Sequence, residues 1–167
     1  PEMMNGRVKT LHPSVHAGIL ARRDRPDDLQ SIETHGIGLI DVVVVNLYPF
    51  AETAADSEAT VDSLIEEIDI GGPTLVRAAA KNFIHVVVVV DPDDYKETMA
   101  QLKNPDGFSM GYRLALAQKA FAHTRSYDDN IASVLATVEA KVDGLARRAA
   151  LSEELAPDKL VLEANRQ

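Results

Sequence analysis

Two runs of valine constrain the fold of this chain more than any other feature. Residues 42–45 and 86–90 are all valine, and they lie within the apolar segments 39–45 and 84–90. Asp41 interrupts the first of these segments. Continuous β-branched segments of this length are typical of strands that are buried on both faces, as in a parallel sheet. We therefore expect two parallel strands at these positions.

Helical patterns alternate with the two strands. Short helices are favoured where a cap residue or an early proline opens the segment, an apolar stripe runs at helical spacing, or a glycine closes it. The helices expected are residues 24–36, 60–68, 73–81, a helix opened by Asp91 and Pro92, and 109 to about 143 with a break near Ser126. This alternation predicts an α/β fold with a parallel sheet. Two strands make a poor independent core, so we expect either a missed strand near residues 12–20 or the absence of part of the fold.

Composition excludes several classes of function. The 167 residues carry a formal net charge of -9, which disfavours non-specific binding of nucleic acid. There is no cysteine, so disulfides and thiolate chemistry are excluded. The longest apolar runs are far shorter than the roughly 20 residues that span a bilayer. We expect a cytoplasmic protein that binds neither nucleic acid nor membranes.

Polar residues follow the first expected strand at its carboxyl end. Ligands of open parallel sheets bind beyond that end, and here Asn46 and Tyr48 offer an amide and a hydroxyl. Taken alone, the segment more often represents a turn with a buried tyrosine than a binding site.

The stretch "IDIGGPTLVRAAAKN", residues 68–82, holds the second group of candidates. It lacks the Gly-Lys-Ser/Thr ending of a phosphate-binding P-loop and is not a dinucleotide fingerprint. Helical spacing places Thr74, Arg77 and Lys81 on one face, and Asp69 precedes the helix. We expect Lys81 to come back towards Asp69 in one small space, an arrangement that can tune proton transfer. An ordinary surface helix with an ion pair is equally compatible with this stretch alone.

The N-terminal segment is rich in hydrogen-bond donors. Arg7, Lys9 and Thr10 could receive an anionic small molecule, although a basic surface loop explains them at least as well. His12 and His16 are four residues apart, but no carboxylate accompanies them and Pro13 argues against a helix through both. We therefore predict no metal site.

Five stretches in this order resemble the IMP cyclohydrolase domain of the bifunctional enzyme AICAR transformylase/IMP cyclohydrolase. They are "GRVKTLHPSVHAGILARR", "IDVVVVNLYPF", "IDIGGPTLVRAAAKN", "VVVVVDPDDY" and "LALAQKAFAHTRSYDDNIA". The resemblance implies a methylglyoxal-synthase-like, three-layer parallel sheet with an extra helical part at the C-terminal end. It also implies the last step of de novo purine biosynthesis, the ring closure of formyl-AICAR to IMP with loss of water.

The resemblance also implies roles for individual residues. Lys81 would transfer protons, Asp69 would be its acidic partner, and Lys9 and Tyr48 would steady the formyl oxygen. The residues expected to contact the nucleotide are Arg7, Val8, Thr10, Val45, Asn46, Ile70, Gly71 and Gly72. The cyclohydrolase reaction would need no cofactor, whereas the transformylase half would use 10-formyltetrahydrofolate.

The resemblance further implies a division of the chain. Residues 1–138 would be a partial cyclohydrolase domain that lacks an N-terminal βαβ segment with the phosphate-binding residues, and 139–167 would lead towards a transformylase domain. The whole protein is expected to be a homodimer. Two alternatives stay open: an inactive fragment, and a regulatory ligand-binding domain of the same fold.

Overall fold

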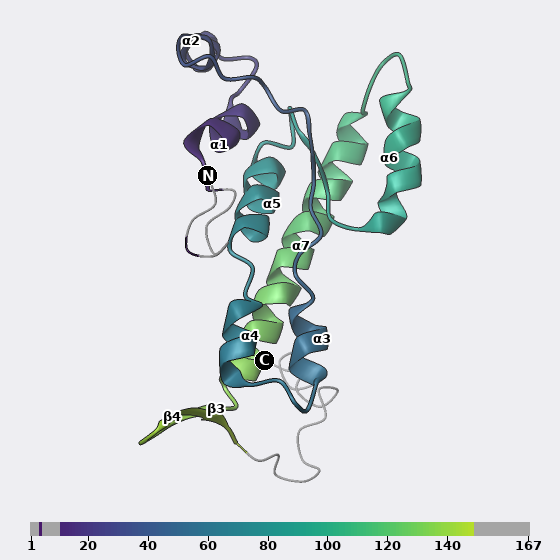
Figure 1. Ribbon diagram of the computed structural model, residues 1–167. Coiled ribbons are helices and arrows are strands. Elements are labelled where there is room, and N and C mark those ends of the chain that lie inside the picture. Colours follow the sequence, from purple (N-terminus) through teal and green to yellow (C-terminus); the bar gives the residue numbers. More distant parts are fainter. Residues whose placement is uncertain (1–3, 5–10, 149–167) are drawn as a thin grey trace, which may run out of the picture.

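The computed structural model describes Met4 and residues 11–148. Figure 1 shows one long helix, α7, running through the molecule, with the other elements arranged along it. In chain order the described elements are α1 (Pro13–Leu20), α2 (Pro26–Thr34), β1 (Val42–Val44), α3 (Phe50–Ala55), α4 (Val61–Glu66), α5 (Gly71–Lys81), β2 (Val87–Val89), a 3₁₀ turn (Pro92–Asp94), α6 (Tyr95–Leu102), α7 (Met110–Leu135), β3 (Val138–Lys141) and β4 (Gly144–Arg147).

The two valine runs form the predicted parallel pair. β1 and β2 lie side by side in the register Val42–Val87, Val43–Val88 and Val44–Val89. Both strands are shorter than the apolar segments that predicted them. β2 is buried throughout, but Val44 is 51% exposed. Burial on both faces is therefore wrong for the end of β1, because α7 packs over β2 and leaves this part of β1 uncovered.

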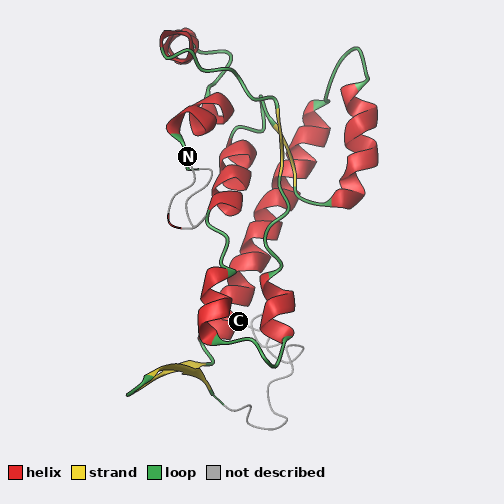
Figure 2. Cartoon of the chain, viewed as in Figure 1, coloured by secondary structure: helices red, strands yellow, loops and turns green. Residues whose placement is uncertain are grey.

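The strand pair lies between two layers of helices. Val43 and Val88 face α5, where they pack with Val76 and other small apolar residues of that helix. Val87 and Val89 point to the opposite face and pack against Leu116 of α7. This alternation follows from the two-residue period of a strand. The helix–sheet–helix order confirms the predicted three-layer α/β class, and Figure 2 shows the strands between the helices.

Helix α5 is amphipathic, as its spacing predicts. Val76 and Ala79 are fully buried, whereas Arg77 and Lys81 are exposed. The helix begins at Gly71 rather than at Pro73. Proline is tolerated there because the first N–H groups of a helix have no partner within it.

The segment suspected of hiding a strand is instead a helix. α1 starts at Pro13, and the ring of His12 caps it by accepting a hydrogen bond from the backbone of Ser14 at 3.2 Å. The helix does not run through both histidines, as Pro13 predicted, because His12 is the cap residue outside α1 and Pro13 occupies the first helical position, where proline is favoured.

Two other predictions for secondary structure were also wrong. Helix α7 runs unbroken past Ser126, where a break was expected, and it ends at Leu135. The helix was expected to continue to about Asp143, but β3 and β4 form an antiparallel hairpin there. Gly144, the first residue of β4, has a positive φ of 136°, a backbone conformation that favours glycine. Helix α3 was not predicted at all. The division at residue 138 remains a prediction, and residues 149–167 lie outside the described part.

Within residues 11–148 no helix combines the length and apolar character needed to cross a membrane.

Candidate active site

The predicted site residues fall into three places. Arg7, Val8, Lys9 and Thr10 lie outside the described residues, so their predicted roles stay predictions. Val45 to Tyr48 follow β1, and Val45 extends the strand ladder by donating to the carbonyl of Val89 at 3.0 Å. Asp69 to Gly72 form the entry to α5, and Lys81 is its last residue.

The strand-end segment and the entry to α5 meet at Gly72. A methyl group placed on Gly72 would lie 2.8 Å from Cδ2 of Leu47 and would overlap the carboxylate of Asp69. No residue larger than glycine fits there without movement of one of these neighbours. The structure thus brings together Asp69, Gly72 and the segment of Asn46 and Tyr48, as the topology of a parallel sheet predicts.

The carboxylate of Asp69 is held by the backbone of α5. Its Oδ1 accepts a hydrogen bond of 2.8 Å from the N–H of Gly72. This contact satisfies one of the unpaired donors of the first helical turn and places a negative charge at the positive end of the helix. Asp69 is partly buried.

Tyr127 of α7 fixes the backbone of the same turn. Its hydroxyl accepts a hydrogen bond from the N–H of Asp69 at 2.8 Å and donates one to the carbonyl of Glu67 at 3.1 Å. Burial raises the pKa of Tyr127, so the hydroxyl keeps its proton at neutral pH. Sequence reasoning missed this role, because a tyrosine in a charged stretch of helix gives no signal of a contact 58 residues away.

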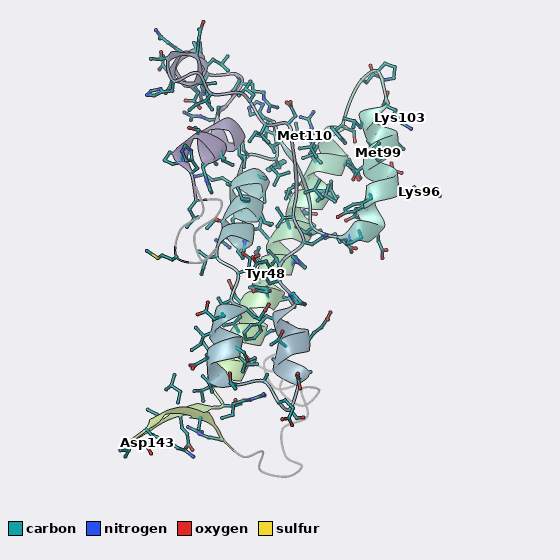
Figure 3. All side chains as sticks on the ribbon, viewed as in Figure 1. Tyr48, Lys96, Met99, Lys103, Met110 and Asp143 are labelled. Carbon is teal, nitrogen blue, oxygen red and sulfur yellow. The ribbon has the colours of Figure 1, made fainter. Side chains whose placement is uncertain are left out.

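Asn46 and Tyr48 have different surroundings. The amide of Asn46 donates to the hydroxyl of Tyr95 at 3.2 Å, which links the end of β1 to the start of α6. Tyr95 is a second residue that sequence reasoning did not single out. Tyr48 is 44% exposed. Figure 3 labels it in the middle of the molecule, between the part with α5 and the part with α3 and α4.

Lys81 lies away from Asp69. The ten residue steps of α5, at about 1.5 Å each, place the helix ends about 15 Å apart. Asp69 precedes one end and Lys81 is at the other, so the predicted convergence of the two side chains is wrong. The sequence argument considered only the helix face that each side chain occupies and neglected the rise along the axis.

Lys81 instead lines an open depression of about 300 Å³ beside α1, with Leu20, Arg22, Asp28 and Asn82. The guanidinium of Arg22 binds the carboxylate of Asp28 through two hydrogen bonds, at 2.8 and 3.0 Å. These bonds hold the pKa of Asp28 well below its usual value. Asn82 is buried and donates to the carbonyls of Ile19 and Ala21, which fixes α1 to the end of α5.

Among the residues that the structure describes, no three His, Cys, Asp or Glu side chains are grouped closely enough to hold a metal ion. The polar groups that the described part of the site offers are carboxylate, hydroxyl, amide and backbone groups.

Comparison with known proteins finds a family match for each half of the chain. Residues 1–74 match the MGS-like domain, and residues 79–160 match the AICARFT/IMPCHase bienzyme. The solved structure "Crystal structure of ForH" superposes with a TM-score of 0.66 at 37% identity, covering 81% of this chain and 70% of that one.

Curated relatives agree with these matches. Proteins named bifunctional purine biosynthesis protein PurH are 57% identical over 130 residues in Staphylococcus carnosus and 55% identical over 140 residues in Thermosynechococcus vestitus. These alignments include 78% and 84% of this chain but only 26% and 27% of the relatives, so the chain spans about a quarter of their length. The chain belongs to the AICARFT/IMPCHase bienzyme family and has the MGS-like fold.

Proposed function

We propose that this chain supplies part of the active site of an IMP cyclohydrolase that closes the purine ring of formyl-AICAR. In this reaction the carboxamide nitrogen bonds to the formyl carbon, and the formyl oxygen takes up the developing negative charge. That oxygen then leaves as water with two protons, one from each nitrogen of the new ring. Positioned hydrogen-bond donors and one proton acceptor are what such a step needs.

The observation that carries the proposal is the placement of Asp69 beside the end of β1. Its carboxylate is anchored by Gly72 and partly buried, and the segment with Tyr48 passes next to it. A fixed carboxylate can accept the carboxamide proton, and an exposed tyrosine hydroxyl can donate to the formyl oxygen. We assign these two roles to Asp69 and Tyr48.

Other predicted participants depend on the family resemblance alone. Proton transfer by Lys81 has no support from its position at the far end of α5, whereas Lys9 and its neighbours lie outside the described residues. Nucleotide contacts through Val45, Asn46, Ile70 and Gly71 are compatible with their positions around the entry to α5.

The whole protein is proposed to be bifunctional. The relatives are named bifunctional purine biosynthesis proteins, which supports a second activity, the transfer of a formyl group from 10-formyltetrahydrofolate to AICAR. We propose further that the whole protein is a cytoplasmic homodimer and that ring closure itself uses no cofactor.

The test is to measure both reactions in the full-length protein with Asp69→Asn. We expect ring closure to fall by at least about 100-fold, because the proton acceptor is lost, while formyl transfer stays at the wild-type rate. Asp62→Asn, an exposed carboxylate on α4, is the matched control and should change neither rate. Wild-type ring closure in the Asp69→Asn protein would refute the assignment of Asp69. A wild-type protein that binds IMP in calorimetry but closes no ring would favour the ligand-binding alternative.

A further inference from the structure

A single hydroxyl bridges both ends of the turn that carries Asp69. The Tyr127 oxygen is 2.8 Å from the backbone nitrogen of Asp69 and 3.1 Å from the carbonyl oxygen of Glu67. The hydroxyl therefore accepts from the peptide N–H of Asp69 and donates to the carbonyl of the peptide group immediately before it. Such a pair of contacts fixes the direction of the peptide before Asp69, and with it the start of the Asp69 side chain.

The tyrosine itself is held firmly. Its side chain is only 8% exposed, and its ring meets that of Phe50 edge to face at 6.3 Å between centroids. Both rings pack with Leu64, which belongs to the helix before the turn. Tyr127 lies on the 26-residue helix α7, the longest described element, so the hydroxyl is a fixed reference point for a short loop.

The carboxylate of Asp69 is therefore fixed from two sides. The N–H of Gly72 holds the carboxylate from α5, and Tyr127 holds the backbone from α7. Removing the Tyr127 hydroxyl leaves only the first contact. The carboxylate could then move with the turn while its bond to Gly72 is kept.

We propose that Tyr127 is a positioning residue that acts on ring closure through Asp69, an inference that rests on the proposed function of this site. Tyr127 touches no reacting atom in this scheme. Displacement of a reacting group by about 1 Å can lower a rate by about 100-fold, so loss of one remote hydroxyl is enough to produce a measurable defect.

The experiment compares Tyr127→Phe with Tyr112→Phe in the full-length protein. Tyr112 is a close match: it lies on the same helix, stacks on Phe108 with centroids 6.2 Å apart, and shares one hydrogen bond of 2.9 Å with Thr98. Both substitutions keep the ring and remove one hydroxyl. We expect Tyr127→Phe to lower kcat for ring closure by about 10- to 100-fold with little change in KM, and Tyr112→Phe to stay within about twofold of wild type. Formyl transfer should be unchanged in both.

A double-mutant cycle separates positioning from general stability. In an Asp69→Asn background, Tyr127→Phe should have no further effect on kcat if it acts through Asp69. A full additional loss in that background, equal losses in the two tyrosine variants, or wild-type kcat in Tyr127→Phe would each overturn the inference.

Amide hydrogen exchange supplies a readout that needs no activity, because exchange at Asp69 should accelerate in Tyr127→Phe and not in Tyr112→Phe. Absence of ring closure in the wild-type protein would refute the proposed function, whereas unchanged exchange at Asp69 would refute the positioning contact.

Discussion

Asp69 and Lys81 lie at opposite ends of α5, with the carboxylate bound to the first turn of the helix and the lysine exposed at the last. The intervening helix is about 15 Å long, so the two side chains cannot form a direct ion pair. Asp69 lies near the segment that follows β1, whereas Lys81 lies beside α1.

The separation predicts that Asp69 and Lys81 act independently on stability. Residues more than about 7–10 Å apart with no shared partner usually have additive effects, within about 0.5 kcal/mol. Asp69→Asn and Lys81→Met should therefore sum in the double variant when the free energy of unfolding is measured with urea. A coupling energy above about 1 kcal/mol would show that the two side chains interact after all.

A side chain at Gly72 is predicted to destabilise the protein. In Gly72→Ala the new methyl group would press on Leu47 and on the Asp69 carboxylate, and such overpacking typically costs about 1–3 kcal/mol. Gly111, in the first turn of α7, has nothing within 4 Å of an added methyl group. Gly111→Ala should therefore leave stability unchanged or raise it by about 0.5–1 kcal/mol. Urea unfolding of both variants tests this, and equal effects would contradict it.

Stability in acid is predicted to depend on Lys119. Its ammonium group lies 2.7 Å from carboxylate oxygens of both Asp91 and Asp94, and these hydrogen bonds raise the pKa of Lys119 to about 12. Hydrogen bonding to Lys119 lowers the pKa of Asp91 below its ordinary value of 3.8. A lowered pKa in the folded state contributes stability that is present above the ordinary value and is lost as the pH falls through the folded one.

Lys119→Met should therefore weaken the dependence of stability on pH below about 4. Denaturant unfolding between pH 7 and pH 2 measures this dependence, and Lys96→Met, an exposed lysine on α6, is the control (Figure 3). The same acid dependence in Lys119→Met and wild type would contradict the role of this ion cluster.

Stability in alkali is predicted to depend on Tyr127. Burial is the main cause that raises the pKa of Tyr127 above its ordinary value of 10.0, and the nearby charges of Asp69, Glu67 and Asp128 raise it further. The contribution of Tyr127 to the free energy of unfolding is complete below pH 10. It is lost as the pH rises through the pKa that Tyr127 has in the folded protein, because the unfolded chain releases the proton first. Tyr127→Phe should show a shallower loss of stability above pH 10 than wild type or Tyr112→Phe. Thermal unfolding at pH 8 to 11 provides the measurement.

Local patterns predicted the elements that depend on neighbouring residues. The valine runs predicted two parallel strands, and the apolar spacing in 73–81 predicted the amphipathic helix α5. Capping rules correctly placed Asp91 before a helical turn, since its carboxylate accepts from the N–H of Asp93 at 2.9 Å. The same rules went wrong where two readings compete locally. Residues 12–20 were suspected of hiding a strand but form α1, and the sequence after Leu135 can continue a helix or turn into a hairpin.

The sequence by itself determined the α/β class, the family resemblance and the two segments of the candidate site, because hydrophobic period, capping residues and long motifs are properties of neighbouring residues. Only the tertiary structure decided which side chains meet. Tyr127 reaches Asp69 across 58 residues, and Leu47 lies against Gly72, whereas Asp69 and Lys81, on one helix, are kept apart by its length. The contacts of Tyr127 with Asp69 and of Leu47 with Gly72 arise from the packing of α7 and β1 against α5. No hydrophobic periodicity within a single segment encodes this packing.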